Sequence, residues 1–254
     1  MNNLIKSVFG SLGVEIRLHK NIPTARAREK HAAMIRQWEL LRRYEPKTLL
    51  DIGANEGQCA AILREVFPKS RILSFEPLSD CFAAVESYLA ANGPGAAYHT
   101  ALGDKNETTT IHRNDFTPSS SMLPMAQLHK EEFPQTESMR PEEVCVQRLD
   151  DLAPELEIES PYIIKVDVQG FEGQVIDGGR ETFAGAEALV VELSSYSLYE
   201  GQSTFESVQE QLESLGFLFR GVIEQAYSKS DRRILQFDGL FEHRRHEERR
   251  HAAN

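Results

Sequence analysis

The sequence predicts an α/β protein with a mostly parallel sheet, helices on both faces and an antiparallel C-terminal edge. Strand-like apolar segments alternate with helix-like segments from residue 48 onward, which is the pattern of strand–helix–strand units. These strands lack a polar residue at every second position, as expected for strands that are buried on both faces. Near the end of the chain, FLFRGVIE and RILQFDGLF follow one another with no helix between them, and so favour an antiparallel hairpin.

The N-terminal part of the chain is expected to be a helical extension. Residues 1–22 show no firm period, whereas residues 24–44 place apolar residues from Ala33 to Leu41 roughly on one helical face. We expect this helix to pack against the main domain, and we place the end of the extension at residue 45.

Three strand segments open the main domain, and they are TLLDIG, RILSFEP and AAYHTALGD. A helix that ends at Phe67 follows the first segment, and LSDCFAAVESYLAANG follows the second with helical character. Residues 104–145 then break the rhythm, because ETTTIHRN and VCVQRL are strand-like but the stretch between them is polar and contains prolines. An unpatterned stretch of this length within a compact domain indicates an inserted hairpin or a functional lid.

Alternation resumes after this insert. The segments in order are YIIKVDVQG, FEGQVIDGG, ALVVELS and the helix FESVQEQLESLG, before the final hairpin. We therefore expect the main domain to span residues 46–242 and a charged tail to span residues 243–254. The tail is charged throughout, which fits a solvated helix end or a disordered terminus.

The composition of the chain limits the classes of partner. A formal charge of −11 over 254 residues would repel phosphate backbones and anionic lipid, so binding to nucleic acid or to a membrane surface is not expected. The three scattered cysteines argue against a disulfide framework and fit a reducing compartment. No run approaches the roughly 20 apolar residues of a membrane span, and the N-terminal segment is too interrupted for a secretory signal. We expect a cytoplasmic protein, and a homo-oligomer stays open.

The segment TLLDIGANEGQ ends a buried strand in Asp51 and turns at once through Gly53 and Gly57 into a helix. Such a turn can serve a dinucleotide, whose pyrophosphate favours GxGxxG, or S-adenosylmethionine, which has no pyrophosphate. The spacing here is GxxxG, so S-adenosylmethionine is the better match. Asp51 could accept a hydrogen bond from its ammonium group, directly or through water. Gly53 would let the main chain turn close under the ligand, and Gly57 would let the helix begin there.

Acids that follow the next two strands extend this predicted site. Glu76 follows the second strand in SFEP, where a carboxylate can bind both hydroxyls of a ribose, although a favourable helix-start charge is the alternative interpretation. Asp104 follows the third strand in ALGD, where an acid could face an adenine amino group, although a turn former explains it almost as well. The predicted cofactor-binding residues are Asp51, Gly53, Ala54, Asn55, Gly57, Glu76, Pro77 and Asp104.

Several motifs stand together in this chain: DIGANEGQ, FEP, ALGD, SSSM, VQRLDDL and above all IIKVDVQGFEGQVIDGG. Together they resemble the FkbM-type methyltransferases, from about Leu49 to Phe219. The resemblance implies a Rossmann-like methyltransferase fold with a seven-stranded sheet. It also implies S-adenosylmethionine-dependent O-methyl transfer to a hydroxyl of a sugar, a glycan or a secondary metabolite. The stretch PMAQLHKEEFPQTESMRPEE matches no family pattern, so the acceptor stays open.

Methyl transfer to an alcohol needs a group that accepts the hydroxyl proton. Asp167 is our first choice for this base, because it ends the strand YIIKVD at the edge of the sheet where open α/β folds bind their ligands. Lys165 lies on the same strand face, and Glu192 ends ALVVE at the same edge. Lys165 is alternatively a structural partner of Asp150, Asp167 or Glu192, since an unpaired buried charge is costly. The predicted catalytic residues are Asp167, Lys165, Glu192 and, as second choice for the base, His112.

Other functions stay open beside this one. Asp150, Asp167 and Glu192 could hold a divalent cation through oxygen ligands, but no histidine motif assists, and no metal ligand is assigned. The chain could also be an NAD-type oxidoreductase, against which the missing GxGxxG argues. A third alternative is a non-catalytic module that keeps the cofactor fold for protein contacts.

Two further groups lie in or beside the variable middle of the chain. His99 and His129 are interpreted as surface residues, because a lone histidine in such a segment is more often exposed than a base. The serines at 119–121 could line the site or form a polar turn.

Overall fold

The computed structural model describes residues 25–136 and 138–247. The chain divides into two units after Gln37, and in the first unit the described residues form most of helix α2 (Ala25–Glu39). The expected helix over residues 24–44 is therefore present, with its last turn as the 3₁₀ helix η2 (Leu40–Tyr44). Residues 1–24 and the end of the predicted tail lie outside the described residues.

A seven-stranded sheet forms the centre of the second unit among the described residues, in the order β3-β2-β1-β7-β8-β10-β9. The first five strands of this order are parallel, and β10 is antiparallel to both of its neighbours. The strands are β1 (Thr48–Ile52), β2 (Arg71–Phe75), β3 (Gly95–Tyr98), β7 (Tyr162–Val166), β8 (Ala188–Ser194), β9 (Phe217–Tyr227) and β10 (Ile234–His243). The mostly parallel sheet with an antiparallel C-terminal edge is confirmed.

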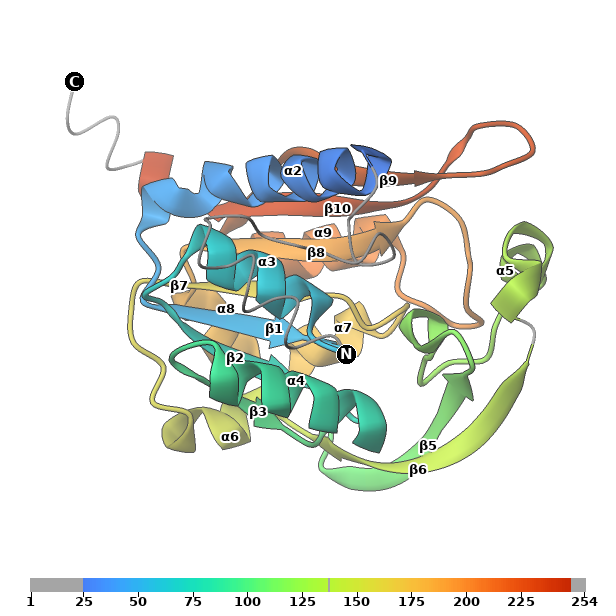
Figure 1. The fold of residues 1–254 in the computed structure, drawn as a ribbon, viewed down its shortest axis with the longest axis horizontal. Coiled ribbons are helices and arrows are strands. Elements are labelled where there is room, and N and C mark those ends of the chain that lie inside the picture. Colours follow the sequence, from blue (N-terminus) through green and yellow to red (C-terminus); the bar gives the residue numbers. More distant parts are fainter. Residues whose placement is uncertain (1–24, 137, 248–254) are drawn as a thin grey trace, which may run out of the picture. The chain divides into compact units, whose positions relative to one another are not determined.

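Helices cover both faces of this sheet. Figure 1 shows α3 and α4 on one side and α7, α8 and α9 on the other. These helices are α3 (Gln58–Val66), α4 (Ser79–Ala91), α7 (Glu172–Gly178), α8 (Arg180–Gly185) and α9 (Phe205–Ser214). Short helical turns α6 (Leu149–Leu152) and η5 (Ala153–Glu155) lead into β7.

Burial on both faces explains why polar and apolar residues do not alternate along the central strands. Every residue of β1 is buried, and Leu50, Ile164 and Leu189 from three neighbouring strands are 0 % exposed within one core cluster. Strands that are covered on both sides need apolar residues at consecutive positions, and this produces the continuous pattern read from the sequence.

The prediction of the third strand is partly wrong. The segment AAYHTALGD is not one strand, because β3 ends at Tyr98 and the chain then leaves the main sheet. The hydroxyl of Thr100 donates to the carbonyl of Cys145, at the start of a three-stranded sheet in the order β4-β6-β5. Its strands are β4 (Ala101–Leu102), β5 (Glu107–Asn114) and β6 (Met139–Gln147).

The insert between β4 and β6 is more ordered than its pattern indicated. Strand β6 begins at Met139, before the predicted VCVQRL, and it passes through Pro141, which lies opposite His112. Proline fits there because the main-chain N–H and C=O of His112 bond to Ser121 on the other side of β5, so this pair across β5 and β6 needs no N–H from Pro141. The rest of the insert forms η3 (Thr117–Ser119), α5 (Gln127–Glu132) and η4 (Pro134–Thr136). In Figure 1, α5 and the β5–β6 hairpin lie beyond the end of the sheet toward which β1 points.

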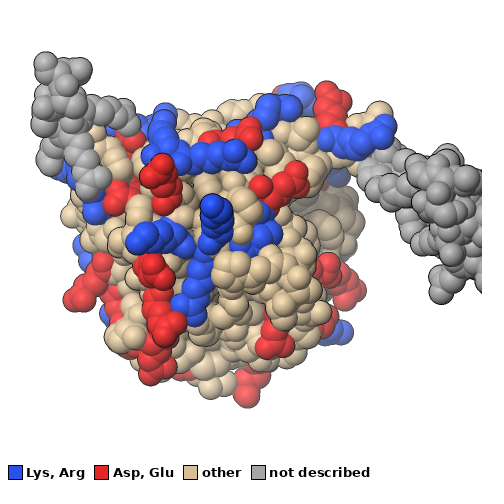
Figure 2. Space-filling model, turned by 60° about the vertical axis from the view of Figure 1, so that its left-hand side comes forward, with Lys and Arg blue, Asp and Glu red and all other residues tan. Residues whose placement is uncertain are grey.

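The surface of the second unit mixes charges of both signs. Figure 2 shows basic and acidic side chains interspersed over the face that it presents. Near the amino ends of β1 and β2, Lys47 pairs with Glu159 at 3.8 Å and Arg71 pairs with Glu157 at 2.9 Å. None of the helices in the described part of the chain combines the length and apolar character needed to cross a bilayer.

Candidate cofactor and acceptor site

The turn after β1 lies directly against the main chain that follows β7. Gly53 has φ +79°, and a Cβ atom built there would lie 1.9 Å from the carbonyl oxygen of Asp167, so a side chain cannot be accommodated. The N–H groups of Gly53 and Ala54 both donate to the carbonyl of Phe75 at the end of β2. Asn55 also has a positive φ of +48°, and its side-chain oxygen accepts a hydrogen bond from Thr117 of the insert at 3.1 Å. The turn is thus fixed by β2, β7 and the insert together.

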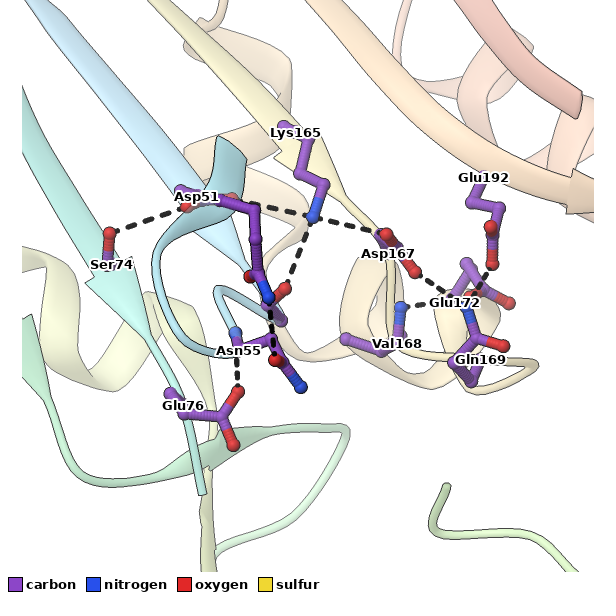
Figure 3. A network of polar contacts seen from close by, with 12 residues as sticks. Asp51, Asn55, Ser74, Glu76, Lys165, Asp167, Val168, Gln169, Glu172 and Glu192 are labelled. Carbon is purple, nitrogen blue, oxygen red and sulfur yellow. Dashed lines mark hydrogen bonds and ion pairs between the residues drawn. The ribbon is translucent and has the colours of Figure 1, made fainter. Parts of the chain in front are cut away.

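Glu76 lies at the end of β2 and faces this turn (Figure 3). One carboxylate oxygen accepts a hydrogen bond from the N–H of Asn55 and the other from the N–H of Leu78, both at 2.8 Å. The residue is 4 % exposed, and burial raises the pKa of Glu76 to about 7 in spite of these two main-chain bonds. Glu76 therefore sits next to the glycine turn, as expected.

Lys165 of β7 lies at the centre of a group of oxygen atoms (Figure 3). Its Nζ is 3.5 Å from Oδ1 of Asp51 and 3.4 Å from Oδ2 of Asp167, and it donates to the carbonyl of Gly53 at 3.2 Å. Burial alone would lower the pKa of Lys165, but the carboxylates of Asp167 and Asp51 outweigh burial and raise it well above its usual value. Lys165 is an ion-pair partner, as one alternative proposed, but Asp51 rather than Asp150 or Glu192 is its second carboxylate.

Asp51 is 0 % exposed and lies below the turn. Its Oδ2 is 3.5 Å from the hydroxyl of Ser74, and burial raises the pKa of this carboxyl although Lys165 opposes the shift. The charge on Asp51 is thus matched by Lys165, and its side chain supports the turn from inside.

Gln169 connects Asp167, which follows β7, with Glu192 in β8. Its Nε2 donates to Oδ1 of Asp167 at 2.8 Å and to Oε2 of Glu192 at 2.5 Å, and its backbone has φ +56°. The loop after β7, which contains Gln169, is held by Glu172. Its Oε1 accepts hydrogen bonds from the N–H groups of Val168 at 3.2 Å and Gly170 at 3.0 Å. Gln169 was not among the predicted site residues.

The acids around Gln169 repel one another. Burial, followed by the charges of Asp167 and Asp238, raises the pKa of Glu192 well above its usual value. Asp238 lies opposite Glu192 across the antiparallel pair of β10 and β8, and burial raises the pKa of Asp238 to about 7. Asp238 was not predicted, because in the sequence it is an isolated acid within the closing hairpin.

Two predicted residues lie away from this group. Asp104 comes six positions after the end of β3, and its main chain packs beside Gly178 at the end of α7 rather than beside the glycine turn. Its expected place opposite an adenine stays a prediction. Asp150 accepts hydrogen bonds from the N–H groups of Glu181 and Thr182 at the start of α8, near the amino end of β8. The set of Asp150, Asp167 and Glu192 is thus not assembled, and no cluster of metal-ligating side chains occurs within the residues described.

The three histidines compare differently with what was expected of them. The main chain of His112 pairs with Ser121, and no described contact brings its ring to Asp167. His99 is exposed, which confirms its interpretation as a surface residue; it follows β3, bonds to the carbonyl of Pro77 at 3.0 Å and stacks on Phe82. His129 is 2 % exposed, which contradicts its interpretation as a surface residue.

The serines at 119–121 contact the site through the loop after β7. The hydroxyl of Ser121 donates to the carbonyl of Gln169 at 2.6 Å, and the carbonyl of Ser119 lies 3.3 Å from the hydroxyl of Tyr199. Ser119 also ends the turn η3, so both interpretations, lining the site and forming a polar turn, stay open.

Comparison with known proteins gives two matches in sequence. Residues 51–219 match the family model described as the methyltransferase FkbM domain. The chain is 31 % identical over 186 residues to the 2-O-methyltransferase NoeI of Sinorhizobium fredii (strain NBRC 101917 / NGR234), and the match covers 69 % of this chain and 74 % of that protein.

Solved structures with a similar course of the chain have low sequence identity. Magnesium protoporphyrin IX methyltransferase (ChlM) from Synechocystis PCC 6803 is 10 % identical, with a TM-score of 0.44 and coverage of 94 % of this chain and 95 % of that chain. Fibrillarin from Aeropyrum pernix is 11 % identical, with a TM-score of 0.45 and coverage of 83 % and 74 %. The assignment to a family depends on the two sequence matches alone.

Proposed function

Because the chain belongs to the FkbM methyltransferase family, and is an S-adenosylmethionine-dependent methyltransferase, we propose that it methylates a hydroxyl oxygen of a small-molecule or glycan acceptor. Transfer to oxygen is supported by the name of the relative NoeI, a 2-O-methyltransferase. The observation that carries the proposal is the position of Asp167. Its carboxylate is 34 % exposed, and its main chain contacts the glycine turn at Gly53, so a proton acceptor adjoins the cofactor loop.

The residues around the turn suit the adenosyl part of the cofactor. Each oxygen of Glu76 accepts one main-chain bond and keeps a second lone pair, so the carboxylate can accept from two ribose hydroxyls. Gly53 permits a close approach of main chain that any side chain would prevent. Asp51, being fully buried and paired with Lys165, contributes by holding this turn in place.

The bound cofactor supplies a methyl group that is already activated on a sulfonium, so the protein has to orient the acceptor and take up a proton. Asp167 takes up the hydroxyl proton of the acceptor. Lys165 and Gln169 contact its two carboxylate oxygens separately and hold the group in one orientation. Burial and the charges of Asp167 and Asp238 raise the pKa of Glu192 well above its usual value, which makes Asp167 the stronger candidate for the base.

Affinity for S-adenosylmethionine will increase as the pH rises from 6 to 8. The pKa of Glu76 in the free protein is about 7, so its carboxyl is largely protonated at pH 6. Ribose hydroxyls bond best to the ionised form, and each pH unit below this pKa therefore weakens binding by up to about tenfold. Isothermal titration at several pH values measures the effect. An affinity that is independent of pH in Glu76→Gln, but not in the wild type, identifies Glu76 as the titrating group.

The acceptor class can be tested with S-adenosylmethionine that carries a radiolabelled methyl group. Neutral glycans and hydroxylated metabolites are offered, with amines of similar size as the comparison. Label that enters hydroxylated compounds in a base-stable ether supports the proposal. Label that enters only amines or thiols, or protein, overturns O-methyl transfer.

A further inference from the structure

A buried series of hydrogen-bonded side chains connects the insert with the amide of Gln169. The hydroxyl of Tyr199 donates to Oε1 of Gln169 at 2.9 Å and lies 3.3 Å from Nε2 of His129. On its other side, Nδ1 of His129 is 3.3 Å from the hydroxyl of Thr136. Thr136 is fixed in turn by Asn114 of β5, whose side-chain amide donates to its carbonyl. Tyr199 is 0 % exposed, so none of these bonds can be replaced easily by bulk water.

These hydrogen-bonded side chains determine the orientation of the Gln169 amide. Both hydrogens of Nε2 are directed at the carboxyl groups of Asp167 and Glu192, so Oε1 must find a donor on the opposite side. The hydroxyl of Tyr199 is that donor, and its contact with Oε1 is shorter than its contacts with His129 and Ser119. If the amide turned over, its oxygen would face two carboxyl groups. The hydroxyl of Tyr199 therefore disfavours the turned orientation.

The insert that carries His129 is anchored at two further points. The N–H of Ala126 donates to the carbonyl of Leu198 at 2.9 Å, next to Tyr199. Glu132 at the end of α5 accepts hydrogen bonds from the hydroxyls of Ser228 at 2.8 Å and Ser230 at 3.3 Å, in the loop between β9 and β10. His129 is thus held in α5 at a fixed place relative to the carboxyl end of the sheet.

We propose that Tyr199 and His129 are positioning residues, which hold the Gln169 amide so that its nitrogen bridges Asp167 and Glu192. In this arrangement Nε2–H of His129 donates to the hydroxyl of Tyr199, and that hydroxyl donates to Gln169. The insert thereby supplies part of the support for the proposed base. The inference rests on the proposed function, because it takes Asp167 as the group that receives the proton.

The orientation of the amide can be observed without an acceptor. In the 15N–1H spectrum of the full chain, the side-chain amide of Gln169 is identified by its absence in Gln169→Met. We expect this resonance to be ordered and protected from solvent exchange in the wild type. Tyr199→Phe keeps the ring in its apolar surroundings but removes the donor, so the resonance should lose its protection and shift. Tyr196→Phe, an exposed tyrosine in the same loop, is the matched control and should leave the resonance unchanged. An unchanged Gln169 resonance in Tyr199→Phe overturns the proposal.

Turnover provides the second test, with the hydroxylated compound that accepts most label in the acceptor assay. Tyr199→Phe should lower kcat roughly tenfold with little change in KM, because the base is misplaced while both ligands still bind. The double variant with Gln169→Met should be no slower than Gln169→Met alone, since Tyr199 acts through Gln169. Losses that multiply in the double variant overturn the proposal.

His129 provides a pair of variants for the case that Tyr199→Phe does not fold. His129→Gln places an amide nitrogen close to the position of Nε2 and should keep most of kcat, whereas His129→Leu should behave like Tyr199→Phe. Equal rates for these two variants contradict a donor role for His129. A wild-type rate in Asp167→Asn would overturn the assignment of Asp167 as the base. The Gln169 resonance would still show whether Tyr199 orients the amide, so the two proposals are tested separately.

Discussion

Asp167→Asn will lower kcat for methyl transfer by a factor of about 10² to 10⁴, which is the usual contribution of a positioned general base. Asparagine has the shape of aspartate but cannot take up a proton, so the acceptor hydroxyl keeps its proton during attack. The affinity for S-adenosylmethionine should stay within about twofold of the wild type, because Glu76 and the glycine turn are unchanged. Methyl-transfer kinetics and isothermal titration on the same preparation separate these two effects.

Asp104→Asn is the matched control for this experiment. It changes the same functional group, but it lies beside the end of α7 and not at the carboxyl end of β7. Its kcat should equal that of the wild type, because it is not placed to take up the proton of the acceptor. A wild-type kcat in Asp167→Asn would show that another group takes up the proton. A loss of cofactor affinity in Asp104→Asn would support the predicted position of Asp104 beside the adenine.

Lys165→Met will lower the free energy of unfolding by about 3–5 kcal/mol, because it removes the cation from a buried pair. Asp51 is completely buried, and without Lys165 its carboxyl must either stay charged in a low-dielectric surrounding or bind a proton. The same change removes the hydrogen bond to the carbonyl of Gly53, so the glycine turn loses a support. Urea denaturation at neutral pH measures the change.

Two variants control for the loss of a lysine as such. Lys47→Met removes an exposed lysine whose partner Glu159 is 3.8 Å away, and it should change stability by less than about 1 kcal/mol. The double variant Asp51→Asn with Lys165→Met should be more stable than Lys165→Met alone, because no charge is left buried without a partner. If Lys165→Met unfolds at the same urea concentration as the wild type, the pair with Asp51 has no structural importance.

The sequence predicted those parts of the site that follow directly from strand ends. Asp51, Glu76 and Asp167 each come at or just after the end of an apolar strand, and parallel strands bring their carboxyl ends to one edge. Their proximity therefore follows from the order of elements alone. Lys165 and Asp51 occupy paired positions on β7 and β1, but this pairing depends on the register of two strands, which no local pattern specifies.

The errors concern segments where the chain leaves the main sheet. The third strand was predicted too long because AAYHTALGD has the same apolar character on both sides of Thr100, although the strand ends before that residue. His129 was misinterpreted because α5 is short and polar. Its ring packs against Phe133 just after α5 and against Tyr199, which lies far away in the sequence. Contacts between segments far apart in sequence leave no periodic signal, so the network around Gln169 could not be predicted.

The account depends on the adenosyl group binding between the glycine turn and Glu76. Isothermal titration of the wild type and of Glu76→Ala with S-adenosylmethionine at pH 8 tests this most directly. We predict binding to the wild type and a loss of affinity of about ten- to a hundredfold in Glu76→Ala, as expected when a charged hydrogen-bond acceptor is removed. Equal affinity of the two proteins, or binding of NAD in place of S-adenosylmethionine, would contradict the account.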